Sequence, residues 1–362
     1  MTTSRMNRRQ LLARASALGL VTVGAGGLIR PARAASTGLT VMDWTGYEVP
    51  ELFQPYIKKY GAAPDITIFS DLEEAWQKIA GGFRPDIMHA DHWQIPARRD
   101  AGMFEPWDTA RLSNFAALMP DLVNLPTLQH EGKQYGIPAD WGINSICYRT
   151  DLITVEEESW STLWNPAFSG KIAQTGQMDN MVGSAALALG IANPFVNDPE
   201  IMKAIEAKMT EQRALLRFYW SDPTQLSQAM ATGEVAIAFA WPSVYKELKA
   251  QGVPVKYMRP KEGVMGWAQG MLLMKDRDGD TQKAYDFMDA WAAAETGRWL
   301  IENYGYGHAN AISVDGVAPD ILADLMLEDP TKTLQSSFFI RDMPQDVQTA
   351  YVAMVERMKA GG

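Results

Sequence analysis

Short apolar runs near the start of the chain alternate with segments whose apolar residues have helical spacing. The runs at 39–42, 65–69 and 85–89 predict three strands. Segments 51–60 and 72–80 between them each have one apolar face, which predicts two helices. Strands and helices that alternate in this way indicate βαβ units and therefore a parallel sheet.

A similar alternation returns in the second half. Strands are predicted at 143–148, 171–173, 235–241, 255–258 and 271–274, and helices at 97–103, 181–189, 201–216, 281–294, 295–303 and 344–359, with a loop at 304–308. Two stretches rich in Gly and Trp, 136–142 and 266–270, are predicted to cross between lobes. A chain of 362 residues is too long for one ordinary core. The pattern therefore predicts an α/β protein with two lobes.

The first 34 residues have the features of a targeting segment. Asn7-Arg8-Arg9-Gln10-Leu11-Leu12 has the twin-arginine pattern, a mild apolar region follows, and Ala32-Arg33-Ala34 fits a cleavage site. We expect export through the twin-arginine route and a mature protein that begins at Ala35; a retained N-terminal anchor is the alternative. The segment holds six arginines and no acid, so its removal leaves 27 basic and 43 acidic residues. A net charge of −16 disfavours nucleic acid and anionic lipid and attracts cations.

Aromatic residues are concentrated where the predicted strands end. The chain has 12 Trp. Five of these lie in helical patterns and are predicted to be core residues: Trp76, Trp160, Trp164, Trp291 and Trp299. The aromatics at predicted strand ends or crossovers are Trp44, Tyr47, Trp93, Trp141, Trp241, Trp267 and Tyr306. Aromatic faces attract cations by about 0.5–2 kcal/mol each, so this second group predicts a cation site, whereas the alternative is that Trp44 and Tyr47 simply cap the sheet.

Enzyme and metal chemistry has weak support. Cys147, the only cysteine, excludes an internal disulfide and lies in an apolar run, which predicts a buried and inert thiol. His89-x-x-His92 with Asp91 is a short metal-like motif at a strand end, and 276–280 departs from the calcium-loop pattern. We therefore predict no enzyme activity, no metal and no cofactor.

The stretch Asp43-Trp44-Thr45-Gly46-Tyr47-Glu48-Val49-Pro50 resembles a segment of the periplasmic spermidine/putrescine-binding proteins, the solute-binding components of polyamine ABC importers. Further similar segments follow in order: 135–142, 159–166, 233–235, 260–263 with Trp267, and 305–306. The resemblance implies the type II periplasmic-binding-protein fold, with two α/β lobes, a hinge and a ligand cleft between the lobes. It implies an N-terminal lobe of 35–142 plus 268–312 and a C-terminal lobe of 143–267 plus 313–362.

The resemblance also implies ligand contacts. The family's aromatic and hydroxyl positions correspond to Trp44, Thr45, Tyr47, Trp241, Trp267 and Tyr306. Where the spermidine binders carry acids, this chain has Gln177, Asn180 and Gln269. An ammonium that faces amides loses charge-assisted bonds of roughly 1.5–3 kcal/mol each, so a long polyamine held at both ends is disfavoured.

Other residues could replace the missing acids. Asp91 and Asp140, beside Trp93 and Trp141, are candidates for one cationic head, as are Asp43 and Asp222, although each of these acids could instead cap a helix. Arg217 could hold a carboxylate or could be a surface residue.

The expected function is capture of a small cationic amine for an inner-membrane ABC permease by a monomeric periplasmic protein. An ω-amino acid such as 4-aminobutyrate, or a quaternary ammonium compound, is the alternative ligand; a chemoreceptor partner and a periplasmic enzyme are the other open functions.

Overall fold

The computed structural model describes residues 38–70, 72–340 and 343–360. The proposed leader, residues 1–34, lies outside them. By its contacts, Thr37–Gly362 forms one unit. None of the helices in the described part of the chain is long and apolar enough to cross a membrane.

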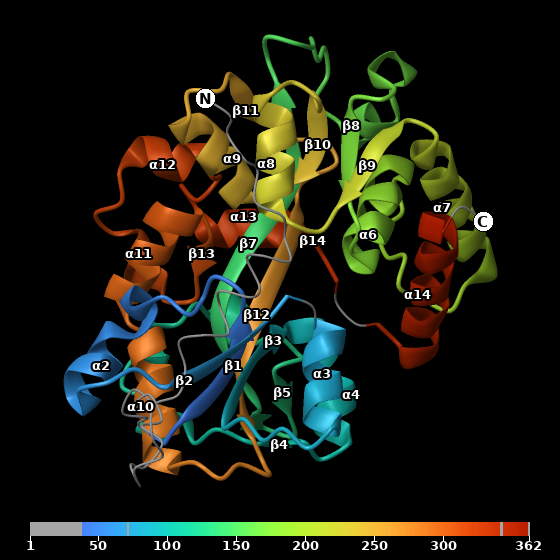
Figure 1. Cartoon of the computed structure of the whole chain (residues 1–362). Coiled ribbons are helices and arrows are strands. Elements are labelled where there is room, and N and C mark those ends of the chain that lie inside the picture. Colours follow the sequence, from blue (N-terminus) through green and yellow to red (C-terminus); the bar gives the residue numbers. More distant parts are fainter. Residues whose placement is uncertain (1–37, 71, 341–342, 361–362) are drawn as a thin grey trace, which may run out of the picture. The chain divides into compact units, whose positions relative to one another are not determined.

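The structure is α/β (Figure 1). Its strands are β1 (Thr40–Trp44), β2 (Asp65–Phe69), β3 (Ile87–Asp91), β4 (Phe104–Glu105), β5 (Gln129–His130), β6 (Lys133–Gln134), β7 (Gly136–Arg149), β8 (Ile172–Thr175), β9 (Leu216–Trp220), β10 (Ile237–Ala240), β11 (Val255–Tyr257), β12 (Met265–Met274), β13 (Gly307–His308) and β14 (Phe338–Phe339). The main sheet has the order β2-β1-β3-β12-β7-β10-β8-β9.

The α-helices are α2 (Gln54–Tyr60), α3 (Leu72–Ala80), α4 (Ile95–Asp100), α5 (Pro120–Val123), α6 (Met178–Leu189), α7 (Pro199–Arg213), α8 (Pro223–Ala231), α9 (Pro242–Ala250), α10 (Thr281–Trp291), α11 (Ala294–Tyr304), α12 (Pro319–Asp324), α13 (Pro330–Ser336) and α14 (Gln345–Ala360). Short 3-10 turns are η1 (Pro50–Phe53), η2 (His92–Gln94), η3 (Thr109–Arg111), η4 (Phe115–Ala117), η5 (Trp160–Trp164), η6 (Pro166–Phe168) and η7 (Ala311–Val314). Side-chain caps begin several helices; Asp198, Asp222 and Asp280 accept backbone N–H groups at the starts of α7, α8 and α10.

Two long antiparallel strands run through the middle of the sheet. β7 is buried over its whole length, and β12 pairs with it from Met265 to Leu272 (Figure 1). The first part of β7, up to Asn144, pairs with β12, and its last part, from Ser145, pairs with β10 and β11. β12 in turn pairs with β3. The carboxyl end of β3 therefore lies beside the middle of this central pair, and β1 follows on its other side.

The parallel βαβ run predicted near the start is present, since β1 pairs in parallel with both β2 and β3. Several other predictions were wrong. The helix expected at 201–216 ends at Arg213, and part of the expected loop at 304–308 is β13. The segments expected to cross between lobes lie within the long strands β7 and β12, and their role as crossovers stays a prediction. Helices α8, α9, α12 and α13 had not been predicted. Leu216 begins β9 because it and residues 218–220 pair in parallel with β8, a contact with no local signal in the sequence.

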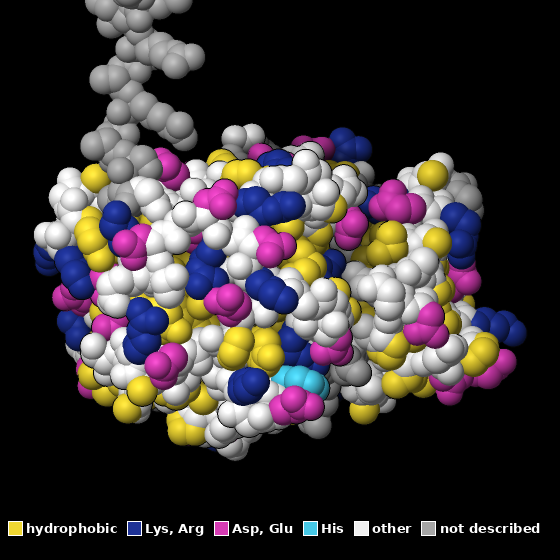
Figure 2. Space-filling model, turned by 90° about the horizontal axis from the view of Figure 1, so that it is seen from below, with side chains coloured by type: hydrophobic (Ala, Val, Ile, Leu, Met, Phe, Trp, Pro, Cys, Tyr) yellow, Lys and Arg dark blue, Asp and Glu magenta, His cyan; other side chains and the backbone are white. Residues whose placement is uncertain are grey.

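Charged residues of both signs are mixed over the face shown in Figure 2. Over the described chain as a whole, many charged residues form exposed ion pairs, such as Lys261–Glu157 and Arg217–Glu234. Exposed pairs of this kind contribute little to stability.

Candidate functional site

The turn after β1 is held in place by its own backbone and by β2. Thr45 donates its N–H to the Phe69 carbonyl (2.8 Å), and Tyr47 donates its N–H to the Trp44 carbonyl (3.0 Å). Gly46 has φ +100°, a left-handed conformation that a side chain would strain. The half-buried Trp44 ring packs on Phe69 with 4.7 Å between ring centroids. The turn therefore presents Trp44 at the carboxyl end of β1, where open α/β sheets bind ligands.

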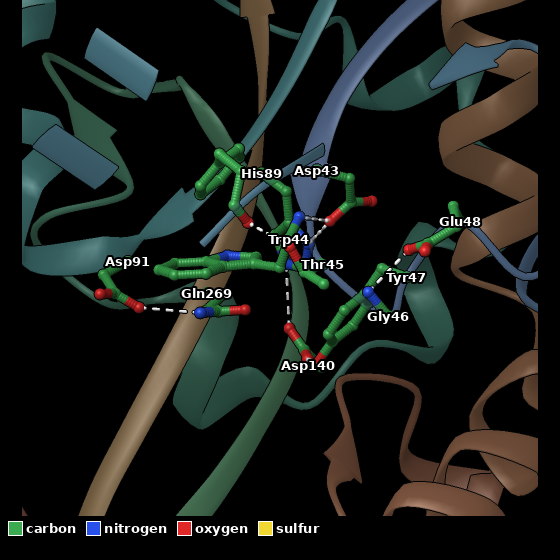
Figure 3. A network of polar contacts seen from close by, with 11 residues as sticks. Asp43, Trp44, Thr45, Gly46, Tyr47, Glu48, His89, Asp91, Asp140 and Gln269 are labelled. Carbon is green, nitrogen blue, oxygen red and sulfur yellow. Dashed lines mark hydrogen bonds and ion pairs between the residues drawn. The ribbon is translucent and has the colours of Figure 1, made fainter. Parts of the chain in front are cut away.

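Beneath this turn lies a fully buried chain of polar groups (Figure 3). Asp43 Oδ1 lies 2.8 Å from His89 Nδ1, and Asp140 Oδ1 lies 3.0 Å from His89 Nε2. Tyr47 donates its hydroxyl to Asp140 Oδ2 (2.6 Å). Burial lowers the pKa of His89, but the two carboxylates outweigh it and raise that pKa to about 10. Asp140 and Tyr47 thus have their polar groups inside the protein, facing one another.

A second polar group lies at the neighbouring strand end. Gln269 on β12 faces Asp91 on β3 in the sheet register and donates its Nε2 to Asp91 Oδ1 (2.9 Å; Figure 3). Burial, and next the Asp179 carboxylate on α6, raise the pKa of Asp91 to about 7, whereas the Gln269 bond lowers it. Two carboxylates on distant parts of the chain are therefore close enough to repel each other.

Amide groups continue from this carboxylate pair. Asn180 on α6 donates to Gln177 Oε1 (2.6 Å) and accepts from Asn144 Nδ2 (3.3 Å). Among the described residues, Asn144 Oδ1, Gln269 Oε1 and the Trp44 indole N–H are buried without a hydrogen-bond partner. Buried polar atoms normally have partners. The cluster of Asp91, Asp179 and these amides therefore has spare acceptors suited to a donor-rich ligand.

Aromatic rings form a connected row beside these groups. The ring centroids of Tyr47 and Tyr304 lie 5.9 Å apart, those of Tyr304 and Tyr306 lie 6.1 Å apart, and those of Tyr306 and Trp267 lie 5.1 Å apart. The Tyr304 hydroxyl donates to the Gly46 carbonyl (2.6 Å). Trp267 lies flat against Gly142, where a Cβ would be only 2.5 Å from the ring. We call this row, with Trp44, the aromatic wall.

Trp241 immediately precedes α9 and packs edge-to-face on the buried Trp220, with 4.9 Å between centroids. The Tyr306 hydroxyl contacts Ser243 Oγ, two residues further along the chain, at 3.2 Å. Tyr306 therefore links the strand-end aromatics of β12 to the start of α9, and Trp241 lies next to that contact in the sequence.

The family described as "Bacterial extracellular solute-binding protein" matches residues 51–325. The chain belongs to this family. The chain is 23% identical over 331 residues to the "Spermidine/putrescine-binding periplasmic protein" of Escherichia coli, covering 88% of this chain and 90% of that protein.

Solved structures share the fold of this solute-binding protein. A putative spermidine/putrescine ABC transporter protein from Listeria monocytogenes matches with a TM-score of 0.77 at 20% identity, covering 89% of this chain and 98% of that one. A GABA receptor matches with a TM-score of 0.70 at 17% identity, covering 89% and 96%. The type II periplasmic-binding-protein fold expected from the sequence is confirmed.

The structure brings most of the expected site residues of this solute-binding protein together at the strand ends, but it places four elsewhere. Trp141 is buried and donates its indole N–H to the His308 carbonyl (3.1 Å). Trp93 is 9% exposed, in the short turn after β3. Arg217 is exposed on β9 and pairs with Glu234 at 2.8 Å. Thr45 is also exposed, and its hydroxyl donates to the Phe69 carbonyl (3.1 Å).

Three residues that the sequence did not single out belong to the same cluster: Asp179, Asn144 and Tyr304. Asp179 lies between the expected Gln177 and Asn180 in the first turn of α6, so its neighbours could have indicated it. Asn144 and Tyr304 reach the cluster through strand pairing and helix packing, for which the sequence has no local signal.

The groups considered for metal or nucleophile chemistry have other roles. Both ring nitrogens of His89 face carboxylates, and His92 Nδ1 bonds the Thr127 hydroxyl (2.9 Å). Cys147 is buried, as predicted, and burial raises the pKa of its thiol. Asp222, considered as a cation ligand, accepts the Thr224 N–H as the cap of α8. Within the described residues, no group of three His, Cys, Asp or Glu side chains could hold a metal ion.

Proposed function

We propose that this solute-binding protein of an ABC importer captures a small amine, and that the cationic head lies between Asp91 and Asp179. The observation that supports the proposal is the mutual repulsion of two carboxylates, one at the end of β3 and the other in the first turn of α6. An ammonium between them would remove their repulsion and donate charge-assisted hydrogen bonds to both carboxylates. Each such bond is worth roughly 1.5–3 kcal/mol.

The aromatic wall would supply the apolar sides of the site. Trp44 and Trp267 are half-buried, so each keeps part of its ring available. A cation over a Trp face gains about 0.5–2 kcal/mol, depending on how far it is desolvated. Tyr304 and Tyr306 complete the wall, with the buried Tyr47 at its inner end, and we propose that Trp241 extends it beyond Tyr306.

The amides Gln177, Asn180, Gln269 and Asn144 would set the length and orientation of the ligand. Amides both donate and accept hydrogen bonds. A second candidate ligand is therefore an ω-amino acid such as 4-aminobutyrate, with its carboxylate bound by amide N–H groups. The shared fold with a GABA receptor supports this candidate. Arg217 has little part in it, because this side chain is exposed and already paired.

The remaining features describe how such a protein would work. We propose export by the twin-arginine segment, and two lobes with the boundaries 35–142 plus 268–312 and 143–267 plus 313–362. A ligand that contacts both lobes favours their closed arrangement by its differential affinity. The closed form would deliver the amine to a permease in the inner membrane, without chemistry on the ligand.

Isothermal titration calorimetry with putrescine, spermidine, 4-aminobutyrate and glycine betaine tests the proposal. We expect binding of at least one, and a loss of tenfold or more, or about 1.4 kcal/mol, in both Asp91→Asn and Asp179→Asn. The matched control is Asp222→Asn, because Asn also caps helices well. No heat with any of the four compounds would refute the cation site.

The same titration separates the two ligand classes. If Arg217 has no role, Arg217→Ala binds every compound like the wild type. A preference for 4-aminobutyrate that disappears in Arg217→Ala would instead assign the carboxylate of the ligand to Arg217 and contradict our placement of the site.

A further inference from the structure

Asp43, His89, Asp140 and Tyr47 form a buried polar network inside the protein. All four residues are at most 6% exposed. They come from the end of β1, from β3, from β7 and from the turn after β1, so this polar network connects these segments. A buried ionic group of this size destabilises a protein unless its members pair closely, so its presence at the candidate site needs an explanation.

Both ring nitrogens of His89 lie against carboxylates. Each nitrogen lies within 3.0 Å of a carboxylate oxygen. A neutral imidazole has one N–H and one lone pair, and the lone pair would face a carboxylate. Asp43 Oδ1 also accepts the Trp44 backbone N–H (2.8 Å). The arrangement therefore fits an imidazolium between two carboxylates, which outnumber it by one negative charge.

This polar network contacts the aromatic wall through Tyr47. Tyr47 is held by its bond to Asp140, stacks on Trp291 (5.7 Å between centroids) and meets Tyr304 edge-on. Asp43 holds the backbone N–H of Trp44. The groups that face His89 are Asp43 from β1, Asp140 from β7, the Tyr47 ring from the turn and the Trp291 ring from α10. Charges in this polar network also act on Asp91, because His89 lowers the pKa of Asp91 and Asp140 raises it.

We propose that His89 is a positioning residue: as a buried imidazolium between Asp43 and Asp140, it fixes the 43–47 turn and hence Trp44. The residual negative charge of the cluster adds to the attraction for a cation beside Asp91. This role goes beyond the proposed function, since the position of the turn can be measured without any ligand.

Nitrogen NMR of protein labelled at histidine tests the charge state in the ligand-free protein. The chain has four His, so His89 can be assigned from His89→Gln. We expect both ring nitrogens of His89 to be protonated at pH 7 to 8. His92 and His308 are internal controls, because burial lowers the pKa of each to about 4. An unprotonated ring nitrogen on His89 at pH 7 would overturn the proposal.

Hydrogen exchange tests the positioning role, again without ligand. In His89→Gln we expect the backbone amides of 43–47 to exchange at least about tenfold faster. The matched control is His308→Gln: His308 is also buried, but it bonds Ser313 and the Trp291 carbonyl rather than carboxylates. Equal exchange of the turn in His89→Gln and the wild type would refute the role.

Asp43→Asn keeps the test valid if His89→Gln does not fold. Its amide oxygen can still accept from His89, so the turn should keep its wild-type exchange, whereas putrescine binding should weaken several-fold because one negative charge is gone. Wild-type putrescine affinity in this variant would refute the electrostatic part. If wild-type protein binds no amine at all, the proposed function fails, but the NMR and exchange results still decide the role of His89.

Discussion

Asp91 shows at the scale of one residue how a carboxylate can be prepared for a cation. Burial, together with Asp179, makes its ionised form costly, so its pKa rises to about 7. An amine that binds between the two acids favours the ionised form. Binding and proton release are therefore linked at this residue.

We predict that amine affinity rises with pH between about 5.5 and 8. Below the raised pKa of Asp91, a proton competes with the amine, and the affinity should fall by up to roughly tenfold per pH unit. Titration calorimetry at several pH values measures the slope. In Asp91→Asn the slope should flatten, and an unchanged slope in that variant would assign the proton to another group.

The raised pKa of Asp91 also makes the ligand-free protein less stable as pH rises, whereas amine binding becomes stronger. Because the folded pKa of Asp91 lies above its unfolded value, the folded state holds the proton more tightly, and this contribution to stability is lost as pH rises from about 4 to 7. We expect Asp91→Asn to raise the midpoint of thermal unfolding at pH 8 but to have little effect at pH 4. A lower midpoint at pH 8 would show that the Gln269 bond outweighs the desolvation.

At the scale of elements, the pairing of β7 with β12 decides where the aromatic wall stands. Gly142 faces Trp267 in the register of the two strands, and the absence of a side chain lets the ring lie against the backbone. The position of Trp267 therefore depends on a residue from a different strand, more than a hundred positions earlier in the sequence.

Gly142→Ala should displace Trp267 and weaken amine binding by tenfold or more, because its Cβ would be 2.5 Å from the ring. Gly136→Ala is the control, since it lies on the same strand and its Cβ would meet Leu128 at 2.8 Å instead. Both variants should lose some thermal stability, but only Gly142→Ala should lose affinity. Equal affinities, measured by calorimetry, would exclude Trp267 from the wall.

At the scale of the whole molecule, Asp91 and Asp179 belong to the two different lobes that we propose. In the ligand-free protein these charges repel each other, which favours separation of the lobes. A bound amine reverses this balance, since it attracts both acids.

Small-angle scattering should show a smaller radius of gyration when a saturating amine is added. Thermal unfolding should also shift upward, because a ligand at 100 times its Kd adds about 2.7 kcal/mol to the free energy of unfolding. Asp179→Asn, which keeps Asp91 but loses the second carboxylate, should show a much smaller contraction. Full contraction in this variant would place the contact of the second lobe elsewhere.

Local patterns in the sequence were sufficient for individual elements and for the broad class. The strand at 65–69 and the helix at 72–80 have the predicted bounds. Trp76, Trp160, Trp164 and Trp291 are buried as expected from their helical spacing. The fold and the family were also identified from the order of the matching segments. These features depend on periodicity and residue type, which are properties of neighbouring residues.

Only the tertiary structure decided which side chains meet. From the sequence, Tyr47, Asp140, Trp44 and Asp91 are equally good candidates for ligand contact. In the structure, Tyr47 and Asp140 are hydrogen-bonded to each other in the interior. Arg217 is drawn to Glu234 by the pairing of β8 with β9 and β10. Asp179 reaches Asp91 because α6 starts near the end of β3, which no local pattern records. The composition of the chain thus indicated a cation site, and the long-range pairing of its strands selected the carboxylates that would form it.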